Sequence, residues 1–139
     1  MNIQSAKYAN QEQTILAVSS DGTLLSVPWP CQTWHNQAVQ EWLDAGNIIQ
    51  PYAKYDTLEA AKVGCIAEIN HECTRRILTK WPLEKQQACS LGVYPTATAE
   101  QCADDIAAMI LASNTASDAV GAATTISEAE AVSPNWPVI

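Results

Sequence analysis

The sequence predicts an α+β protein in which an N-terminal β-hairpin with a short helix precedes a small, mostly helical C-terminal region. Near the N-terminus, two runs of apolar and β-branched residues flank an Asp-Gly pair, which is typical of a hairpin. From residue 58 onward, apolar residues recur at steps of three and four, which is typical of amphipathic helices. The stretch 48–52 is expected to be extended, because Gln50 precedes a proline. We therefore expect a hairpin–helix unit over residues 1–53 and a helical unit over residues 54–139, which ends in an extended tail.

The hairpin is predicted from two apolar segments, Thr14–Val18 and Thr23–Val27. Gly22 lies between them and can adopt the positive φ that a tight hairpin turn needs. Pro28 and Pro30 are expected to end the second strand, because proline cannot donate a hydrogen bond to the ladder.

A short helix is predicted over Gln37–Ala45, where Gly46 provides the stop signal. A two-stranded hairpin with one short helix has too little core to be stable alone. Such a unit is more typical of a docking element than of a catalyst, so the N-terminal unit indicates a protein that binds another protein.

The strongest helical signal covers Leu58–Thr79. Asp56 and Glu59 are spaced as the N-cap and N3 residues of a capping box, and Trp81-Pro82 is expected to stop the helix. The spacing predicts one stripe along this helix, apolar except for Lys62, formed by Leu58, Lys62, Cys65, Ile66, Ile69, Cys73 and Ile77.

Two further helices are predicted, over Leu83–Ser90 and over Glu100–Ser113. Pro82 suits the first turn of the former, and Thr98 is placed as the N-cap of the latter. Asp104 and Asp105 are interpreted as first-turn charges that the helix dipole favours. The apolar stripe of the second helix is expected to contain Cys102, Ile106, Met109 and Ile110.

The C-terminal part gives weaker signals. Asn114–Ala123 is rich in Ala, Ser and Thr, and either continues or restarts a helix or is poorly ordered. Thr125–Glu128 has the spacing of a third capping box before a short helical turn. Ser133–Ile139 contains two prolines and is expected to be extended.

The net charge of −8 argues against a nucleic-acid partner. Binding phosphates needs Lys and Arg gathered on one face, and the chain has seven in all. In the densest group, Arg76 stands four residues after Glu72, which indicates a solvated helix face. The longest apolar run, Ile106–Ala112, is too short to cross a bilayer, so no membrane partner is expected.

The five cysteines show no framework spacing and are expected to be free, mostly buried thiols of a protein made in a reducing cytoplasm. On a helix, Cys65 and Cys73 would lie about 12 Å apart along the axis, and His71 would face elsewhere, so we expect no metal and no cofactor. The alternative from another class is a thiol-based enzyme or redox protein that uses Cys31 with His35. No third group is evident to orient this pair, so no catalytic residue is assigned.

Three tryptophans precede prolines, namely Trp29, Trp81 and Trp136. Each ring either closes the end of a small core or, for Trp29 and Trp136, anchors an interface, where tryptophan is enriched. The candidate interface consists of residues from the hairpin, the long helix and the tail: Leu16, Val18, Leu25, Trp29, Ile66, Ile69 and Trp136.

Several short segments resemble small tail proteins of tailed bacteriophages. In the N-terminal unit these are Lys7–Asn10, Ser20–Gly22, Ser26–Pro28 and Glu41–Asn47. In the helical unit, Ala67–Cys73 is similar to a shared I-x-E-I-N-x-x-C stretch of those proteins. Trp81–Gln86 and Asn135–Pro137 are also similar to them and to tail-fibre assembly proteins.

The resemblance implies a non-enzymatic tail protein that binds the tail fibre or a baseplate protein. It would act as a fibre-linked structural component of the virion or as a fibre assembly chaperone, in the virion tail or in the host cytoplasm during assembly. The resemblance implies no catalytic residues, and association between copies of this chain is left open. We expect the contact surfaces to be the hairpin edge and the exposed part of the long-helix stripe.

Overall fold

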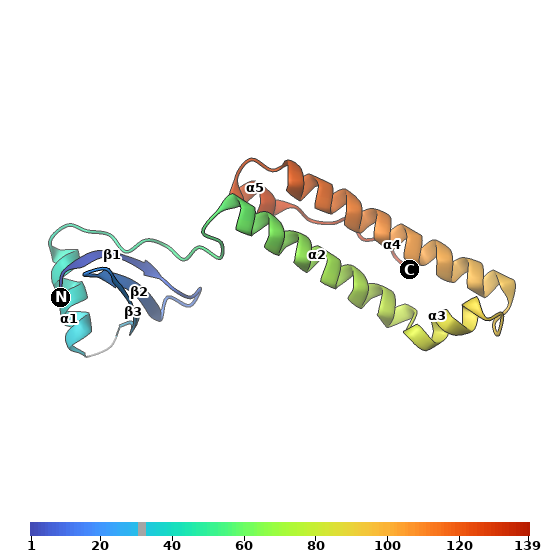
Figure 1. Ribbon diagram of the computed structural model, residues 1–139, viewed down its shortest axis with the longest axis horizontal. Helices are drawn as coiled ribbons and strands as arrows, with labels where there is room; N and C mark the ends of the chain where they lie inside the picture. The colour runs from blue at the N-terminus through green and yellow to red at the C-terminus, as the bar shows by residue number, and fades with distance from the viewer. Residues whose placement is uncertain (31–32) are drawn as a thin grey trace. The chain divides into compact units, whose positions relative to one another are not determined.

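The computed structural model describes residues 1–30 and 33–139 and has an α+β fold (Figure 1). A three-stranded antiparallel sheet is followed by a mostly helical region with packed helices. Contacts divide the chain into one compact unit, Met1–Lys54, and a second, Tyr55–Ile139. This boundary lies one residue from the one expected from the sequence.

The sheet contains β1 (Ile3–Tyr8), β2 (Ile15–Ser20) and β3 (Thr23–Pro28) in the order β1-β2-β3. The expected two-stranded hairpin is therefore incomplete, because β1 adds a third strand beside β2. A register shift between Ile3 and Ser5 interrupts the alternation of buried and exposed residues in β1. This irregularity hides the two-residue period by which a strand is recognised in a sequence.

The predicted turn between β2 and β3 is confirmed. Asp21 and Gly22 have φ values of 52° and 78°, the left-handed pair that a type I′ turn requires. Asp21 tolerates this conformation better than most residues do, and Gly22 adopts it without a steric penalty.

Helix α1 (Trp34–Asp44) begins three residues earlier than expected, and Gly46 follows it with a φ of 95°. Val39 on α1 is fully buried and belongs to the core cluster that the sheet forms. The buried members of this cluster are Ile3, Ala6, Leu16, Val18, Val27 and Val39. The N-terminal unit thus has a core of its own, to which the missed strand β1 contributes.

The second unit contains four helices among the described residues: α2 (Leu58–Lys80), α3 (Leu83–Ser90), α4 (Thr96–Ala122) and α5 (Ile126–Ala131). Helices α2 and α4 lie side by side along most of their lengths, and the C-terminal segment runs back along them (Figure 1). Helix α5 packs mainly against α2. The prediction for α3 is confirmed with its bounds, and α2 ends one residue later than expected.

The predicted start of α2 at Leu58 is confirmed, but two predicted N-cap residues are wrong. Thr57 rather than Asp56 is the N-cap of α2, and its side-chain oxygen accepts a hydrogen bond from the N–H of Ala60 at 3.1 Å. Helix α4 begins at Thr96, directly after Pro95, so Thr98 is not its N-cap. The third predicted start is confirmed, because Thr125 caps α5 and accepts a hydrogen bond from the N–H of Glu128.

Helix α4 continues without a break through the segment whose order the sequence left open. The core between the helices consists mostly of small residues, which allow the helix backbones to approach closely. Its buried members are Ala61, Cys65, Ile69, Ala116, Val120, Ala123 and Ala129.

Candidate interaction surfaces

The outer edge of β3 carries backbone groups that point away from β2. Ser20 and Thr23 flank the two-residue turn and form a hydrogen-bonded pair. Along an antiparallel ladder, hydrogen-bonded pairs alternate with pairs that are not hydrogen-bonded to each other. At the far end of the ladder, the N–H of Trp29 donates to the carbonyl of Thr14 at 2.7 Å, in step with this alternation. The N–H and C=O groups of Leu24 and Ser26 therefore face outward. Within residues 1–30 and 33–139, neither residue makes a hydrogen bond along this edge.

The opposite edge of the sheet is partly occupied by the segment after α1. The N–H of Gln50 donates to the carbonyl of Ala6 at 2.9 Å, and its carbonyl accepts from the N–H of Tyr8 at 3.0 Å. The edge of β3 is therefore the more open of the two among the described residues. Pro28 stands on the outward side at the end of β3 and keeps the open stretch short.

The structure places the hairpin residues of the predicted interface mostly in the interior. Leu16 and Val18 are fully buried because β2 is the central strand, so a partner cannot reach them in the folded unit. Leu25 and Trp29 are half-buried against the same cluster. The accessible apolar side chain on β3 is Leu24, which is 72% exposed and was not among the predicted interface residues.

The predicted stripe on α2 is a packing face. Ile69 is buried in the core cluster, and Ile66 is half-buried against it. Helices α4 and α5 cover this face, which leaves little of the stripe exposed. The sequence could not show this, because the covering helices lie far along the chain.

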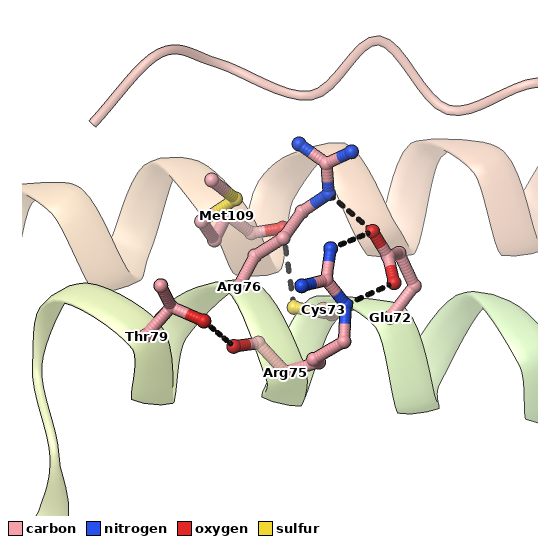
Figure 2. Close-up of polar contacts among 6 residues, drawn as sticks. All are labelled: Glu72, Cys73, Arg75, Arg76, Thr79 and Met109. Atoms are coloured by element: carbon pink, nitrogen blue, oxygen red, sulfur yellow. Dashed lines mark hydrogen bonds and ion pairs between the residues drawn. The ribbon is translucent and has the colours of Figure 1, made fainter.

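A cluster of charges lies on the surface of α2 (Figure 2). Arg75 donates two hydrogen bonds of 2.7 Å to the carboxylate of Glu72, and Arg76 donates a third of 2.7 Å. These hydrogen bonds lower the pKa of Glu72 to about 2. The predicted pairing of Glu72 with Arg76 is confirmed. Both guanidinium groups are engaged within their own helix, which agrees with a solvated helix face.

Trp136 was expected either to close the core or to anchor an interface, and its partial burial is compatible with both roles. Its ring is half-buried against the core cluster of the helical unit. The guanidinium carbon of Arg76 lies 5.4 Å from the ring centroid, within the range of a cation–π contact. Trp81, by contrast, is almost completely buried, so the prediction that its ring closes a core is confirmed.

We expect Trp136→Ala to destabilise the helical unit by about 2 kcal/mol, because it removes a half-buried ring and its cation–π contact. Thermal unfolding followed by circular dichroism measures the effect. Val138→Ala is the matched control, because Val138 is fully exposed in the same tail. Equal melting temperatures for the two variants would show that Trp136 does not support the core and is available as an interface anchor.

Asp105 is a buried carboxylate, although the sequence indicated an ordinary first-turn charge. It accepts hydrogen bonds from Lys80 Nζ at 2.7 Å, Trp81 Nε1 at 2.9 Å and Gln101 Nε2 at 2.7 Å. The hydrogen bond from Lys80 is the largest cause that lowers the pKa of Asp105, and those from Trp81 and Gln101 add to it. The carboxylate thus connects the end of α2 to α4, which is a structural role.

The thiols are mostly buried. Cys65, Cys73 and Cys102 have little exposure, and Cys73 donates a hydrogen bond to the carbonyl of Met109 at 3.6 Å (Figure 2). Burial raises the pKa of the Cys102 thiol, and contact with Cys89 raises it further, which disfavours the reactive thiolate.

The alternative catalytic pair is only half described. Cys31 lies outside the described residues, and the ring of His35 stacks on Trp34 with 3.7 Å between centroids. In the described residues, no group of three His, Cys, Asp or Glu side chains is arranged to hold a metal ion.

No protein-family model, no curated protein and no solved structure matches this chain. Across residues 1–30 and 33–139, no helix combines the length and the hydrophobicity needed to cross a membrane.

Proposed function

We propose that this chain is a non-enzymatic bacteriophage tail protein that binds the tail fibre, as a fibre-linked virion component or as a fibre assembly chaperone. The class of protein comes from the resemblance of its sequence segments. The observation that carries the binding mode is the open edge of β3, where Leu24 and Ser26 direct their backbone groups outward.

Strand addition suits this edge. A partner strand in register with Leu24 and Ser26 would gain two N–H donors and two C=O acceptors from the protein, and alternate side chains would set its specificity. The exposed side chain of Leu24 offers an apolar contact beside these groups. A partner strand there would extend the three-stranded sheet that the described residues form.

Ser26→Pro tests the proposed edge directly. The substitution removes an outward N–H that the β2–β3 ladder does not use, so the fold should persist because proline is tolerated on edge strands. Binding to the purified tail fibre protein of the same phage should weaken at least about ten-fold, because the strand cannot add next to a proline ring. Biolayer interferometry with the full chain measures the loss.

Two variants control this experiment. Ser26→Thr keeps the N–H and should bind as the unaltered protein does, whereas Leu25→Pro removes an inward N–H and should unfold the sheet. Unchanged fibre binding by a folded Ser26→Pro protein would refute the strand-addition mode.

Mass spectrometry of purified virions separates the two forms of the proposal. A structural subunit should be present in proportion to the fibres, whereas a chaperone should be absent from particles and found with fibre protein in infected cells. Absence from both the particles and the fibre pull-down would remove both forms.

A further inference from the structure

An open apolar groove runs along α4, between this helix and the C-terminal segment. Its volume is about 470 Å³. Leu111, whose side chain is 67% exposed, stands on the helix side of the groove. The other lining residues that the argument uses are Ala108, Ala112, Thr115, Ala119 and Pro134.

We propose that this groove binds an amphipathic helix with basic residues that belongs to a different protein. This proposal is separate from the one for the edge of β3, because it concerns a different surface, in the helical unit, and a different kind of partner. Three observations support the proposal. They are the shape of the groove, the carboxylates on the same helix, and the partners that the Lys and Arg side chains of the helical unit already have.

The dimensions of the groove suit a helix. Its helix side extends from Ala108 to Ala119, which at 1.5 Å per residue is about 16 Å, or three turns. A helix of that length can place three or four apolar side chains at i, i+3, i+4 and i+7 into such a groove. Small-molecule sites bury most of their ligand in a cavity, whereas this groove is open, and its polar lining residues, Thr115, Ser133 and Asn135, carry no charge.

Carboxylates lie beside the groove and in line with it. Asp118 lies within the span from Ala108 to Ala119, whereas Asp104 and Glu100 lie about 6 Å and about 12 Å before Ala108 along the helix axis. At about 100° per residue, Glu100, Asp104, Leu111 and Asp118 fall within about 40° of one another around the α4 axis, beside the lining alanines. All three carboxylates are exposed, and within the described residues none has a hydrogen-bond or ion-pair partner. Helix α4 contains no Lys, Arg or His. One carboxylate beside an apolar groove and two beyond its end, on the same face of the helix, favour an occupant whose apolar face is flanked by Lys or Arg.

A second copy of this chain is a poor occupant. The helical unit carries eleven Asp and Glu side chains and only five Lys and Arg. Each of those five cations already contacts a carboxylate, a carbonyl or an aromatic ring within the unit, namely Lys62, Arg75, Arg76, Lys80 and Lys85. Two copies would therefore bring acidic surfaces together without free cations between them, which is repulsive.

The test is a selection of peptides by the full-length protein from a library of randomised sequences of about sixteen residues, long enough for four helical turns. The enriched peptides should combine Lys or Arg with apolar residues at helical spacing. Fluorescence anisotropy then measures their affinity. Leu111→Ser should weaken binding at least about ten-fold, because it removes the exposed apolar wall.

Ile110→Ser is the matched control. Ile110 is the next residue on α4 and is 47% exposed, but it does not line the groove, so binding should change less than about two-fold. A triple variant, Glu100→Gln with Asp104→Asn and Asp118→Asn, should weaken binding and reduce its dependence on salt. Leu111→Ser should leave fibre binding through β3 unchanged, so the two proposals can fail separately.

Three results would overturn the proposal. One is the absence of any enriched peptide. Another is enrichment of acidic or neutral peptides, or of peptides whose affinity Leu111→Ser does not change. The third is a dimer in sedimentation experiments that Leu111→Ser dissociates, because a second copy would then occupy the groove.

Discussion

Ile69→Asp should unfold the helical unit. Ile69 is buried in the core cluster on the face of α2 that α4 and α5 cover. The substitution removes most of an isoleucine side chain from the core and places a carboxylate there without a partner, which together cost about 4 kcal/mol or more. A unit of this size has a total stability of roughly 4–13 kcal/mol. Circular dichroism at 222 nm should therefore show a large loss of helical signal.

Val63→Asp is the control for this prediction. It introduces the same charge on the same helix, at a side chain that is 70% exposed. Its stability should stay within about 0.5 kcal/mol of that of the unaltered protein. A melting temperature for Ile69→Asp close to that of Val63→Asp would show that the α2 stripe is not a packing face.

The features that could be predicted from the sequence are those that a few neighbouring residues determine. The turn at Asp21 and Gly22 needs two positive φ values, and this pair of residue types supplies them locally. The end of α2 at Trp81 and the short helix α3 were likewise predicted from prolines and glycines next to them. Local backbone restrictions of this kind do not depend on the rest of the fold.

Strand β1 was missed because residues 9–14 separate it from β2, without a two-residue turn signal, and because its alternation is irregular. One local signal could have revealed the turn that follows it. The side-chain oxygen of Asn10 accepts hydrogen bonds from the N–H groups of Thr14 and Ile15, both at 3.0 Å, and Gln13 has a φ of 59°. Asparagine is typical of such side-chain-supported turns, so Asn10 before an apolar run indicates a turn between two strands.

The C-terminal half of α4 could not be predicted from the hydrophobicity of its residues. Its buried positions after Met109 are Ser113, Ala116 and Val120, of which only one has a large apolar side chain. Their steps of three and four form a helical stripe, but small residues give a weak amphipathic signal. They are buried because α2 presents Ala61 and other small residues opposite them, and this packing depends on residues far apart in the sequence.

The prediction of the interface residues was limited for the same reason, because burial depends on residues far apart in the sequence. Apolar residues on a strand or helix indicate a buried face, but the sequence alone does not say whether the same chain or a partner covers it. In this protein the chain itself covers Leu16, Val18 and Ile69. Two of the surfaces left open are a backbone edge on β3 and a groove beside Leu111, and neither has a strong hydrophobic pattern in the sequence.

Asp105→Ala should destabilise the helical unit by about 3 kcal/mol and lower its melting temperature by roughly 10–20 °C. The substitution removes the acceptor of the buried Trp81 N–H, which then has no partner, and it also breaks the contact with Lys80. Asp104→Ala is the matched control, because the neighbouring carboxylate is exposed and its loss should change stability by less than about 0.5 kcal/mol.

The pH dependence of the stability difference between the unaltered protein and Asp105→Ala tests whether the charge of Asp105 causes it. The pKa of Asp105 is lower in the folded protein than in the unfolded chain, so the charged carboxylate stabilises the fold at pH values above about 4, the ordinary aspartate pKa. This contribution is lost as the pH falls through the folded-state pKa, where the carboxylate takes up a proton. Denaturant unfolding from pH 7 to pH 2 should therefore show the gap between the unaltered protein and Asp105→Ala narrowing below pH 4. A gap that stays constant over that range would show that the size of the side chain, and not its charge, connects α2 to α4.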